Sequence, residues 1–170
     1  MFTESLVNVV LLSPEIPQNT GNVIRLCANV GARLHLVEPL GFRLDDAKLR
    51  RASLDYTDIA DIICHPSIAA LLELFPIDKV YGAITNGQVQ YDSPRYMSGD
   101  TVIFGPESSG LPHDVVSRLL PGNHIRIPMK PSNRSLNLSN AVAIILYEMW
   151  RQMGFANSAS EPLPNQGHFS

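Results

Sequence analysis

The stretch that decides the fold is Ile127-Pro128-Met129 with Ser135-Leu136-Asn137-Leu138-Ser139-Asn140-Ala141-Val142. Within these sixteen residues we expect the end of a buried strand, a polar loop and the start of a long helix. Two upstream segments have the same character: Asn19-Thr20-Gly21-Asn22 leading to Arg25, and Phe104-Gly105-Pro106-Glu107-Ser108-Ser109-Gly110-Leu111. Because such junctions present backbone groups to a ligand, the three segments together predict one composite site.

The rest of the composition indicates an ordinary globular domain. The chain has 170 residues, of which 45% are hydrophobic and 17% charged, and this suits a single domain with a core. Its start has neither a basic segment nor the run of ~20 apolar residues that a membrane span needs, so we expect a cytoplasmic protein with no membrane partner. Cys27 and Cys64 have no metal or redox spacing and are expected to be buried free thiols.

The charge is distributed unevenly. The net charge of -3 argues against a nucleic-acid partner, but residues 115–170 carry five basic against two acidic groups, and residues 1–114 carry eight against fourteen. Ten of the thirteen basic residues are arginines, which bind phosphate in a forked geometry. We expect most of them to be solvated surface residues all the same.

The order of apolar runs predicts an α/β fold with a mainly parallel sheet covered by helices on both faces. The segment 6–12 is short and β-branched, as in a buried strand, and apolar residues at helical spacing from Val23 to Val30 predict a helix that ends at Gly31. Further strands are expected at 33–37, 80–85, 101–104 and 125–127, and further helices at 45–54, 67–75 and 112–119.

The last helix, expected at 138–153, has two apolar stripes and therefore needs two packing partners. One stripe would pack on the sheet, and the other would form a homodimer contact with Tyr147 and Trp150 as aromatic anchors. The alternative is a helix buried wholly inside one chain. Residues 155–170 are polar and rich in Pro, Ser and Asn, so we expect a domain over 1–154 and a disordered tail.

Each of the three segments offers groups for binding. Asn19 or Thr20 is expected to be a helix N-cap with Arg25 one turn inside, although capping without function is the commoner case. Glu107 is a lone carboxylate beside glycines that allow a ligand close to the backbone. Ser135 and Asn137 are short polar side chains next to apolar neighbours, which suits a polar ligand on an apolar floor.

Several other kinds of site lack support. There is no Gly-rich loop ending in Lys-Ser or Lys-Thr and no G-x-G-x-x-G after the first strand, which argues against an ordinary nucleotide site. The five histidines have no ligand spacing, so no metal is expected. No Ser or Cys nucleophile lies in an elbow motif.

Together the three segments resemble motifs one, two and three of the SPOUT-class RNA 2′-O-methyltransferases, in the same order and with similar spacing. Within this class the chain most resembles the minimal family that methylates the wobble nucleotide of tRNA, which is cytidine or modified uridine at position 34 of the anticodon loop. The resemblance runs from about residue 7 to 154 and includes Pro14-Glu15-Ile16-Pro17 and Leu49-Arg50-Arg51-Ala52-Ser53-Leu54-Asp55-Tyr56.

This resemblance implies a carboxy-terminal trefoil knot, an exception to the general rule that chains are unknotted. It implies a homodimer and S-adenosyl-L-methionine as the methyl donor, with S-adenosyl-L-homocysteine as the product and no metal. The residues that it places around the cofactor are Ala83, Thr85, Gly105, Ile127, Met129, Ser135 and Leu136.

The resemblance also implies the catalytic residues. Arg25 is the family's proposed catalytic residue, and Asn19, Glu107, Ser135 and Asn137 would position it, the ribose and the cofactor. A guanidinium is a poor base because its pKa exceeds about 12, so phosphate anchoring and electrostatic lowering of the hydroxyl's pKa have at least equal weight.

The need for a 2′-hydroxyl makes RNA the substrate and excludes DNA. No separate RNA-binding extension is expected, so the surface of a dimer would bind the anticodon stem-loop. The arginines expected there are Arg25, Arg50, Arg51, Arg134 and Arg151.

Two alternatives stay open. The fold could serve another target, such as another tRNA or rRNA ribose or a base nitrogen. The chain could also be a non-catalytic knotted module for RNA binding or dimerisation, which would bind no cofactor.

Overall fold

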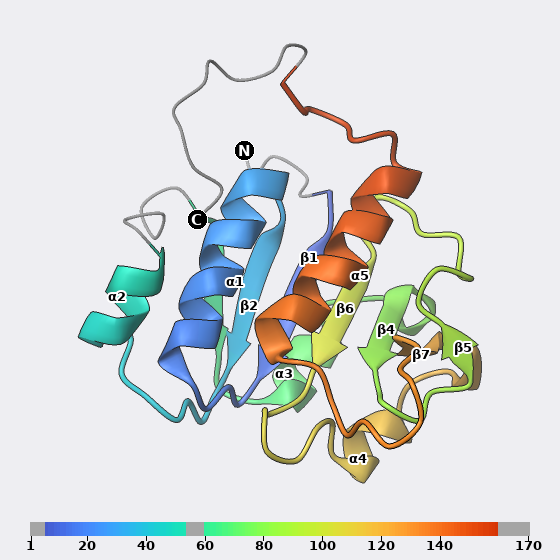
Figure 1. Cartoon of the computed structure of the whole chain (residues 1–170), viewed down its shortest axis with the longest axis horizontal. Coiled ribbons are helices and arrows are strands. Elements are labelled where there is room, and N and C mark those ends of the chain that lie inside the picture. The colour runs from blue at the N-terminus through green and yellow to red at the C-terminus, as the bar shows by residue number, and fades with distance from the viewer. Residues whose placement is uncertain (1–5, 54–59, 160–170) are drawn as a thin grey trace.

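A computed structural model describes residues 6–53 and 60–159, and in this part seven parallel strands form one sheet (Figure 1). The strands are β1 (Asn8–Leu12), β2 (Arg33–Val37), β3 (Ile62–His65), β4 (Val80–Ala83), β5 (Val89–Gln90), β6 (Thr101–Phe104) and β7 (His124–Arg126). The helices are α1 (Pro17–Val30), α2 (Ala47–Ser53), α3 (Ile68–Leu72), α4 (His113–Val116) and α5 (Leu138–Gln152), with 3-10 turns at Ile77–Lys79 and Pro121–Asn123. The strand order is β3-β2-β1-β6-β4-β7-β5, and every pairing is parallel.

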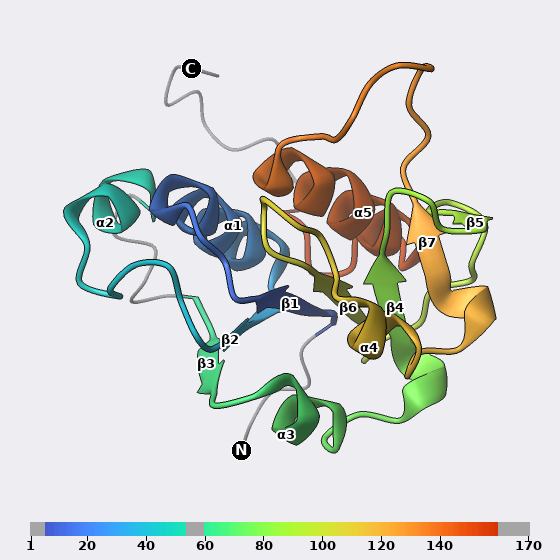
Figure 2. The same cartoon turned by 90° about the horizontal axis from the view of Figure 1, so that it is seen from below.

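Alternation of apolar side chains along the strands gives the sheet two buried faces. In β1, Val9 and Leu11 belong to the core under α1 and α5, whereas Val10 and Leu12 belong to the core under α3 and α4. Figure 2 shows α1, α2 and α5 on one side of the sheet and α3 and α4 on the other. This confirms the expected fold class, because strands buried on both faces read as nearly continuous apolar runs. The knot stays a prediction.

Element boundaries differ from those expected in three ways. The helices expected at 67–75 and 112–119 are shorter, at Ile68–Leu72 and His113–Val116. Helix α1 begins at Pro17 with Ile16 as N-cap, so the expectation that Asn19 or Thr20 caps it was wrong. Proline suits the first helical position because its fixed φ is helical and its missing N–H would have no helical partner. Strands β3 and β5 were not foreseen. They are the two outermost strands of the sheet and are only four and two residues long, too short for a clear alternating pattern.

The two cysteines differ in environment. Cys27 is fully buried in α1, and burial raises the pKa of its thiol to about 12. Cys64 is exposed on the edge strand β3, so the expectation of two buried thiols was wrong for this residue. In the described residues β3 is the outermost strand of the sheet, so fewer elements are available to cover its side chains.

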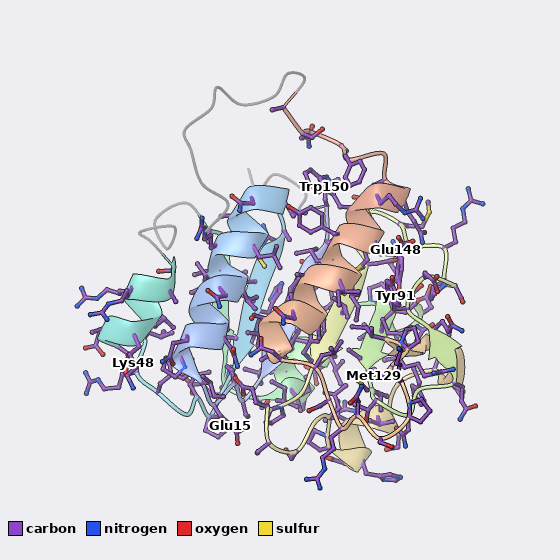
Figure 3. All side chains as sticks on the ribbon, in the orientation of Figure 1. Glu15, Lys48, Tyr91, Met129, Glu148 and Trp150 are labelled. Atoms are coloured by element: carbon purple, nitrogen blue, oxygen red, sulfur yellow. The ribbon has the colours of Figure 1, made fainter. Side chains whose placement is uncertain are left out.

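Helix α5 confirms the two apolar stripes only in part. Trp150, near its carboxyl end in Figure 3, is 9% exposed and packs edge-on against Phe155, while its indole N–H donates to the carbonyl of Ala156 at 2.9 Å. Trp150 therefore has a partner within its own chain, whereas Tyr147 is 42% exposed. The first residues of the expected tail thus turn back onto α5, and residues 160–170 lie outside the described part, as does the motif segment 54–56.

No helix among the described residues is both long and apolar enough to cross a membrane.

A buried histidine links three strands on the face opposite α5. The Nδ1 of His35 in β2 lies 2.8 Å from Nε2 of His65 in β3, and its Nε2 lies 3.2 Å from Oδ1 of Asn8 in β1. Burial, followed by the nearby His65 and Arg33, lowers the pKa of His35 to about 4. The native protein therefore holds this imidazole neutral in mildly acidic solution.

We expect this histidine to make the protein acid-sensitive. The unfolded chain protonates His35 below about pH 6.5, whereas the native protein does so only near pH 4. The unfolded state binds more protons in this window, so the stabilisation is complete above pH 6.5 and is lost as the pH falls to 4. The loss should be of the order of 3 kcal/mol, measured as the free energy of unfolding in urea.

The matched variants are His35→Gln, whose amide can still pair with Asn8 and His65, and His113→Gln on the exposed side of α4. His35→Gln should flatten the pH dependence of the free energy of unfolding between pH 6.5 and 4, and His113→Gln should leave this dependence unchanged. An equal slope in His35→Gln and the wild type would contradict the assignment.

Candidate functional site

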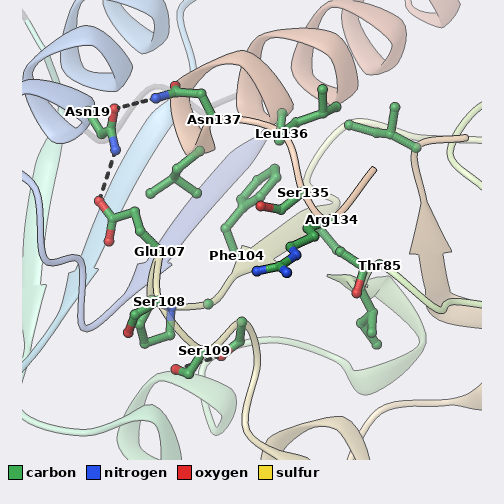
Figure 4. A pocket seen from close by; sticks show the side chains of 18 of the residues that line it. Asn19, Thr85, Phe104, Glu107, Ser108, Ser109, Arg134, Ser135, Leu136 and Asn137 are labelled. Atoms are coloured by element: carbon green, nitrogen blue, oxygen red, sulfur yellow. Dashed lines mark hydrogen bonds between the residues drawn. The ribbon is translucent and has the colours of Figure 1, made fainter. Parts of the chain in front are cut away.

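A pocket of about 600 Å³ lies at the carboxyl ends of β4, β6 and β7, between the N-termini of α1 and α5 (Figure 4). Its wall is made by the segments 83–85, 104–110 and 134–138, by Ile127 and Met129 after β7, and by Ile16 and Asn19 at the start of α1. This is the edge of a parallel sheet where ligands bind, because loops from several strands meet there. The three junctions quoted from the sequence therefore do form one site.

The residues expected to hold a cofactor are all brought together in this pocket. Those that line it are Ala83, Thr85, Gly105, Ile127, Met129, Ser135 and Leu136. The floor includes Phe104, a buried residue at the end of β6 that was quoted with the second segment but was not expected to hold the cofactor. Its position directly before Gly105 was the available signal.

Gly105 is required by the shape of the loop that follows β6. A Cβ atom at this position would overlap the backbone of Gly110 and Leu111, because the loop folds back over it. The fold-back is fixed by Gly110, which has a φ of 70° and donates its N–H to the carbonyl of Pro106 at 2.8 Å. Backbone rather than side chain therefore forms this wall of the pocket.

Glu107 accepts three N–H groups. The backbone N–H of Glu15 donates to its Oε2 at 2.7 Å, and its Oε1 accepts from the N–H of Ile16 at 3.1 Å and from Nδ2 of Asn19 at 3.2 Å. Helix α1 has no cap from its own N-cap side chain, so this distant carboxylate stands at the positive end of its dipole. Glu107 therefore acts here as an acceptor that joins the second segment to the first.

Asn19 connects Glu107 to the third segment. While its Nδ2 donates to Glu107, its Oδ1 accepts from Nδ2 of Asn137 at 3.0 Å (Figure 4). Asn137 is in turn the N-cap of α5, because its Oδ1 accepts from the N–H of Ser139 at 2.9 Å and of Asn140 at 3.4 Å. The side chains of Glu107, Asn19 and Asn137 thus form one hydrogen-bonded row. This row serves the N-termini of both helices and closes one side of the pocket.

The five expected RNA-binding arginines are scattered. Arg134 lines the pocket, and its guanidinium points into it (Figure 4). Arg25 is exposed on α1 and does not line the pocket of its own chain, although the residues expected to position it, Asn19, Glu107, Ser135 and Asn137, all do. Arg50 and Arg51 are exposed on α2. Arg151 forms two hydrogen bonds of 2.8 Å with Glu148 on α5.

Among residues 6–53 and 60–159, no group of three or more His, Cys, Asp or Glu side chains is placed to hold a metal ion. Glu107 and Arg134 are the charged side chains in the described pocket wall.

Comparisons with known proteins cover nearly the whole described chain. Residues 6–147 match the model of the SpoU rRNA Methylase family. A tRNA (cytidine(34)-2'-O)-methyltransferase of Aeromonas hydrophila subsp. hydrophila is 47% identical over 156 residues, which are 92% of this chain and 100% of the relative.

Solved structures share the fold. One, reported as "Structural insights into the 2-OH methylation of C/U34 on tRNA", has a TM-score of 0.82 at 44% identity and covers 87% of this chain and 96% of its own. An AdoMet-bound rRNA methyltransferase from Sinorhizobium meliloti has a TM-score of 0.79 at 26% identity and covers 89% of this chain and 58% of its own.

The row of side chains through Asn19 gives a direct test of the site. In Asn19→Asp a carboxylate oxygen replaces the N–H donor 3.2 Å from Glu107, so repulsion replaces a hydrogen bond. We expect the melting temperature to fall by about 3–8 °C, which corresponds to about 1–2 kcal/mol, with weaker binding of S-adenosylhomocysteine. Asn19→Ala removes the bonds without adding charge and should lie between Asn19→Asp and the wild type.

Asn22→Asp is the matched control, because Asn22 is exposed on the same helix and the substitution adds the same charge. Calorimetry and thermal unfolding of all three variants measure the effect. Equal losses of melting temperature and of binding in Asn19→Asp and Asn22→Asp would show that the hydrogen bonds of Asn19 do not stabilise the site.

Proposed function

This chain belongs to the SpoU rRNA Methylase family, and we propose that it methylates the ribose 2′-hydroxyl of nucleotide 34 in the tRNA anticodon loop. The methyl donor would be S-adenosyl-L-methionine, and the site of action the cytoplasm. The observation that carries the proposal is the joining of three separate motif segments around one pocket, in a chain 47% identical to a relative named for this reaction.

The pocket fits the proposed cofactor. Its volume of about 600 Å³ lies in the range of small-molecule sites. The backbone approach at Gly105 leaves room that a side chain would fill, and Phe104, Ile127 and Leu136 offer apolar surface to a purine ring. Polar groups for the ribose and amino-acid parts are available from the side chains of Thr85 and Ser135.

Bound there, S-adenosylmethionine would supply a methyl group on a positively charged sulfur for in-line transfer to the ribose oxygen. The hydroxyl must lose its proton in the same reaction. Glu107 is poorly suited to take it, because its carboxylate already accepts three N–H groups. We therefore give Glu107, Asn19 and Asn137 a positioning role and assign the activation of the hydroxyl to a cation.

We assign that activation to Arg25 of the partner subunit in a homodimer. Arg25 does not line the pocket of its own chain, but it is exposed on α1, a helix that packs against α5. If two chains associate through these helices, with the exposed Tyr147 of α5 at the contact, each Arg25 can reach the other chain's RNA and pocket. A guanidinium there lowers the pKa of the hydroxyl electrostatically and lets the proton leave to solvent.

The remaining arginines would bind the RNA backbone. Arg134 is the best placed, since it enters the pocket from the loop before α5. Arg50 and Arg51 extend the basic surface along α2. Arg151 is the weakest contributor because Glu148 already holds it, and Trp150 contributes to the dimer mainly by supporting α5 from within the chain.

The first test is the identity of the product. The purified protein is incubated with bulk tRNA and S-adenosylmethionine labelled in the methyl group, and the tRNA is digested and mapped by mass spectrometry. We expect the label on the ribose of nucleotide 34. Label on another ribose or on a base would overturn the choice of target. Absence of cofactor binding in calorimetry would favour a non-catalytic module.

The second test asks whether Arg25 acts across the dimer. Co-expression of Arg25→Ala with Gly105→Ala, each with its own tag, allows the mixed dimer to be isolated. If Arg25 serves the partner's pocket, one of the two sites is complete, and we expect about half the wild-type activity.

The mixed dimer of Arg118→Ala and Gly105→Ala gives the reference for one complete site, because Arg118 is exposed near α4, away from α1. Loss of all activity in the first mixed dimer, with half activity in the reference, would place Arg25 at the pocket of its own chain.

A further inference from the structure

Glu15 lies outside the pocket but holds its wall from behind. This exposed residue precedes α1, where Figure 3 labels it. Its Oε2 accepts the backbone N–H of Ser108 at 2.8 Å, and its Oε1 accepts the hydroxyl of Ser108 at 2.8 Å. Its own backbone N–H donates to Glu107 at 2.7 Å. Glu15 thus accepts hydrogen bonds from the loop after β6 with its side chain and donates one to that loop with its backbone.

This arrangement resembles a capping box in which the two halves come from segments more than 90 residues apart. In a capping box each of two residues accepts the backbone N–H of the other with its side chain. Here Glu107 satisfies the N–H groups before α1, and Glu15 satisfies the N–H of the residue after Glu107. The reciprocity fixes both the distance and the orientation between the two segments.

The loop held in this way is a continuous part of the pocket. All six residues from Gly105 to Gly110 line it. Inside the loop, the bond from Gly110 to Pro106 fixes the fold-back, but it does not fix where the loop lies relative to α1. That placement depends on the contacts of Glu107 and Ser108 with the segment 15–19. A ligand that touches the loop backbone binds more weakly if it must first order the loop.

Glu15 itself has a defined position. Its backbone is packed against Gly41, where a Cβ atom would lie 2.8 Å from the Cα of Glu15. The N–H of Gly41 also donates to the carbonyl of Pro14 at 2.9 Å. The segment that carries Glu15 is therefore supported by the loop after β2, and the carboxylate is a fixed point for the wall of the pocket.

We propose that Glu15 is a positioning residue for methyl transfer, which holds the loop 105–110 in the conformation that binds the methyl donor. This inference rests on the proposed function, since it assumes that the pocket binds S-adenosylmethionine. Glu15 touches neither the donor nor the RNA in this role. Its effect should therefore appear in cofactor affinity and hardly at all in tRNA affinity.

The test compares Glu15→Ala with Glu15→Gln. The alanine removes both contacts with Ser108. The glutamine can keep both, because its carbonyl oxygen can accept the N–H of Ser108 and its amide can donate to the hydroxyl oxygen. We expect Glu15→Ala to raise the Kd for S-adenosylhomocysteine about tenfold in calorimetry and Glu15→Gln to change it less than about threefold, given hydrogen bonds of ordinary strength.

Further measurements separate positioning from loss of structure. In Glu15→Ala the Kd for tRNA and the melting temperature should stay close to those of the wild type, and kcat at saturating cofactor should be kept. Glu73→Ala, at an exposed glutamate after α3 on the opposite side of the sheet, should leave the cofactor Kd unchanged. Adding Ser108→Ala to Glu15→Ala should weaken binding less than Ser108→Ala alone does, because the shared contact is already lost.

An unchanged cofactor Kd in Glu15→Ala, with a wild type that binds the cofactor, would overturn the inference and leave the proposed function intact. An equal loss in the glutamine and alanine variants would also overturn it, because charge rather than the two hydrogen bonds would then be responsible. A wild type that binds no cofactor would instead refute the proposed function.

Discussion

The site depends on the side chain of Asn19, which is 6% exposed and bonded at both ends. An amide is the group suited to this place, because it donates to the carboxylate of Glu107 with one end and accepts from Asn137 with the other. A carboxylate would repel Glu107, and an apolar side chain would leave Asn137 without this acceptor. Since Glu107 and Asn137 each serve the N-terminus of a helix, one buried amide sets the relative position of α1, α5 and the loop after β6.

The order of the strands explains why this amide can meet both partners. From β1 the chain builds outward through β2 and β3, and its later strands are added on the other side, with β6 directly beside β1. The loop after β1 and the loop after β6 therefore lie at the same edge of the sheet and at the point where the direction of building reverses. Open parallel sheets bind ligands at such points. Glu15 and Glu107 make use of this proximity by exchanging contacts across it.

Much of the fold and of the candidate site could be predicted from the sequence, because apolar runs, capping glycines and family motifs can each be recognised within a short stretch of residues. The bounds of β2 and β6, the end of α1 at Gly31 and the residues around the pocket follow from apolar runs, a glycine in the left-handed region and quoted motifs. What could not be predicted depends on long-range contacts. The cap of α1 comes from Glu107 in a distant segment, and the indole of Trp150 is covered by a turn in the expected tail. Neither contact leaves a local signal.

Arg25 lies outside the pocket of its own chain. The described pocket wall of one chain contains one carboxylate, held by three N–H groups, and one cation, Arg134, which comes from the loop before α5. The wall is thus well suited to hold a donor molecule. Glu107 is engaged in hydrogen bonds that shape the pocket, and we assign Arg134 to binding the RNA backbone, so neither group is assigned to activating the hydroxyl. Arg25 is instead exposed on α1. A division in which one chain holds the donor and the other supplies the activating cation would make methyl transfer depend on association. A small domain could then keep its pocket walls rigid and assemble the reacting groups only in the dimer.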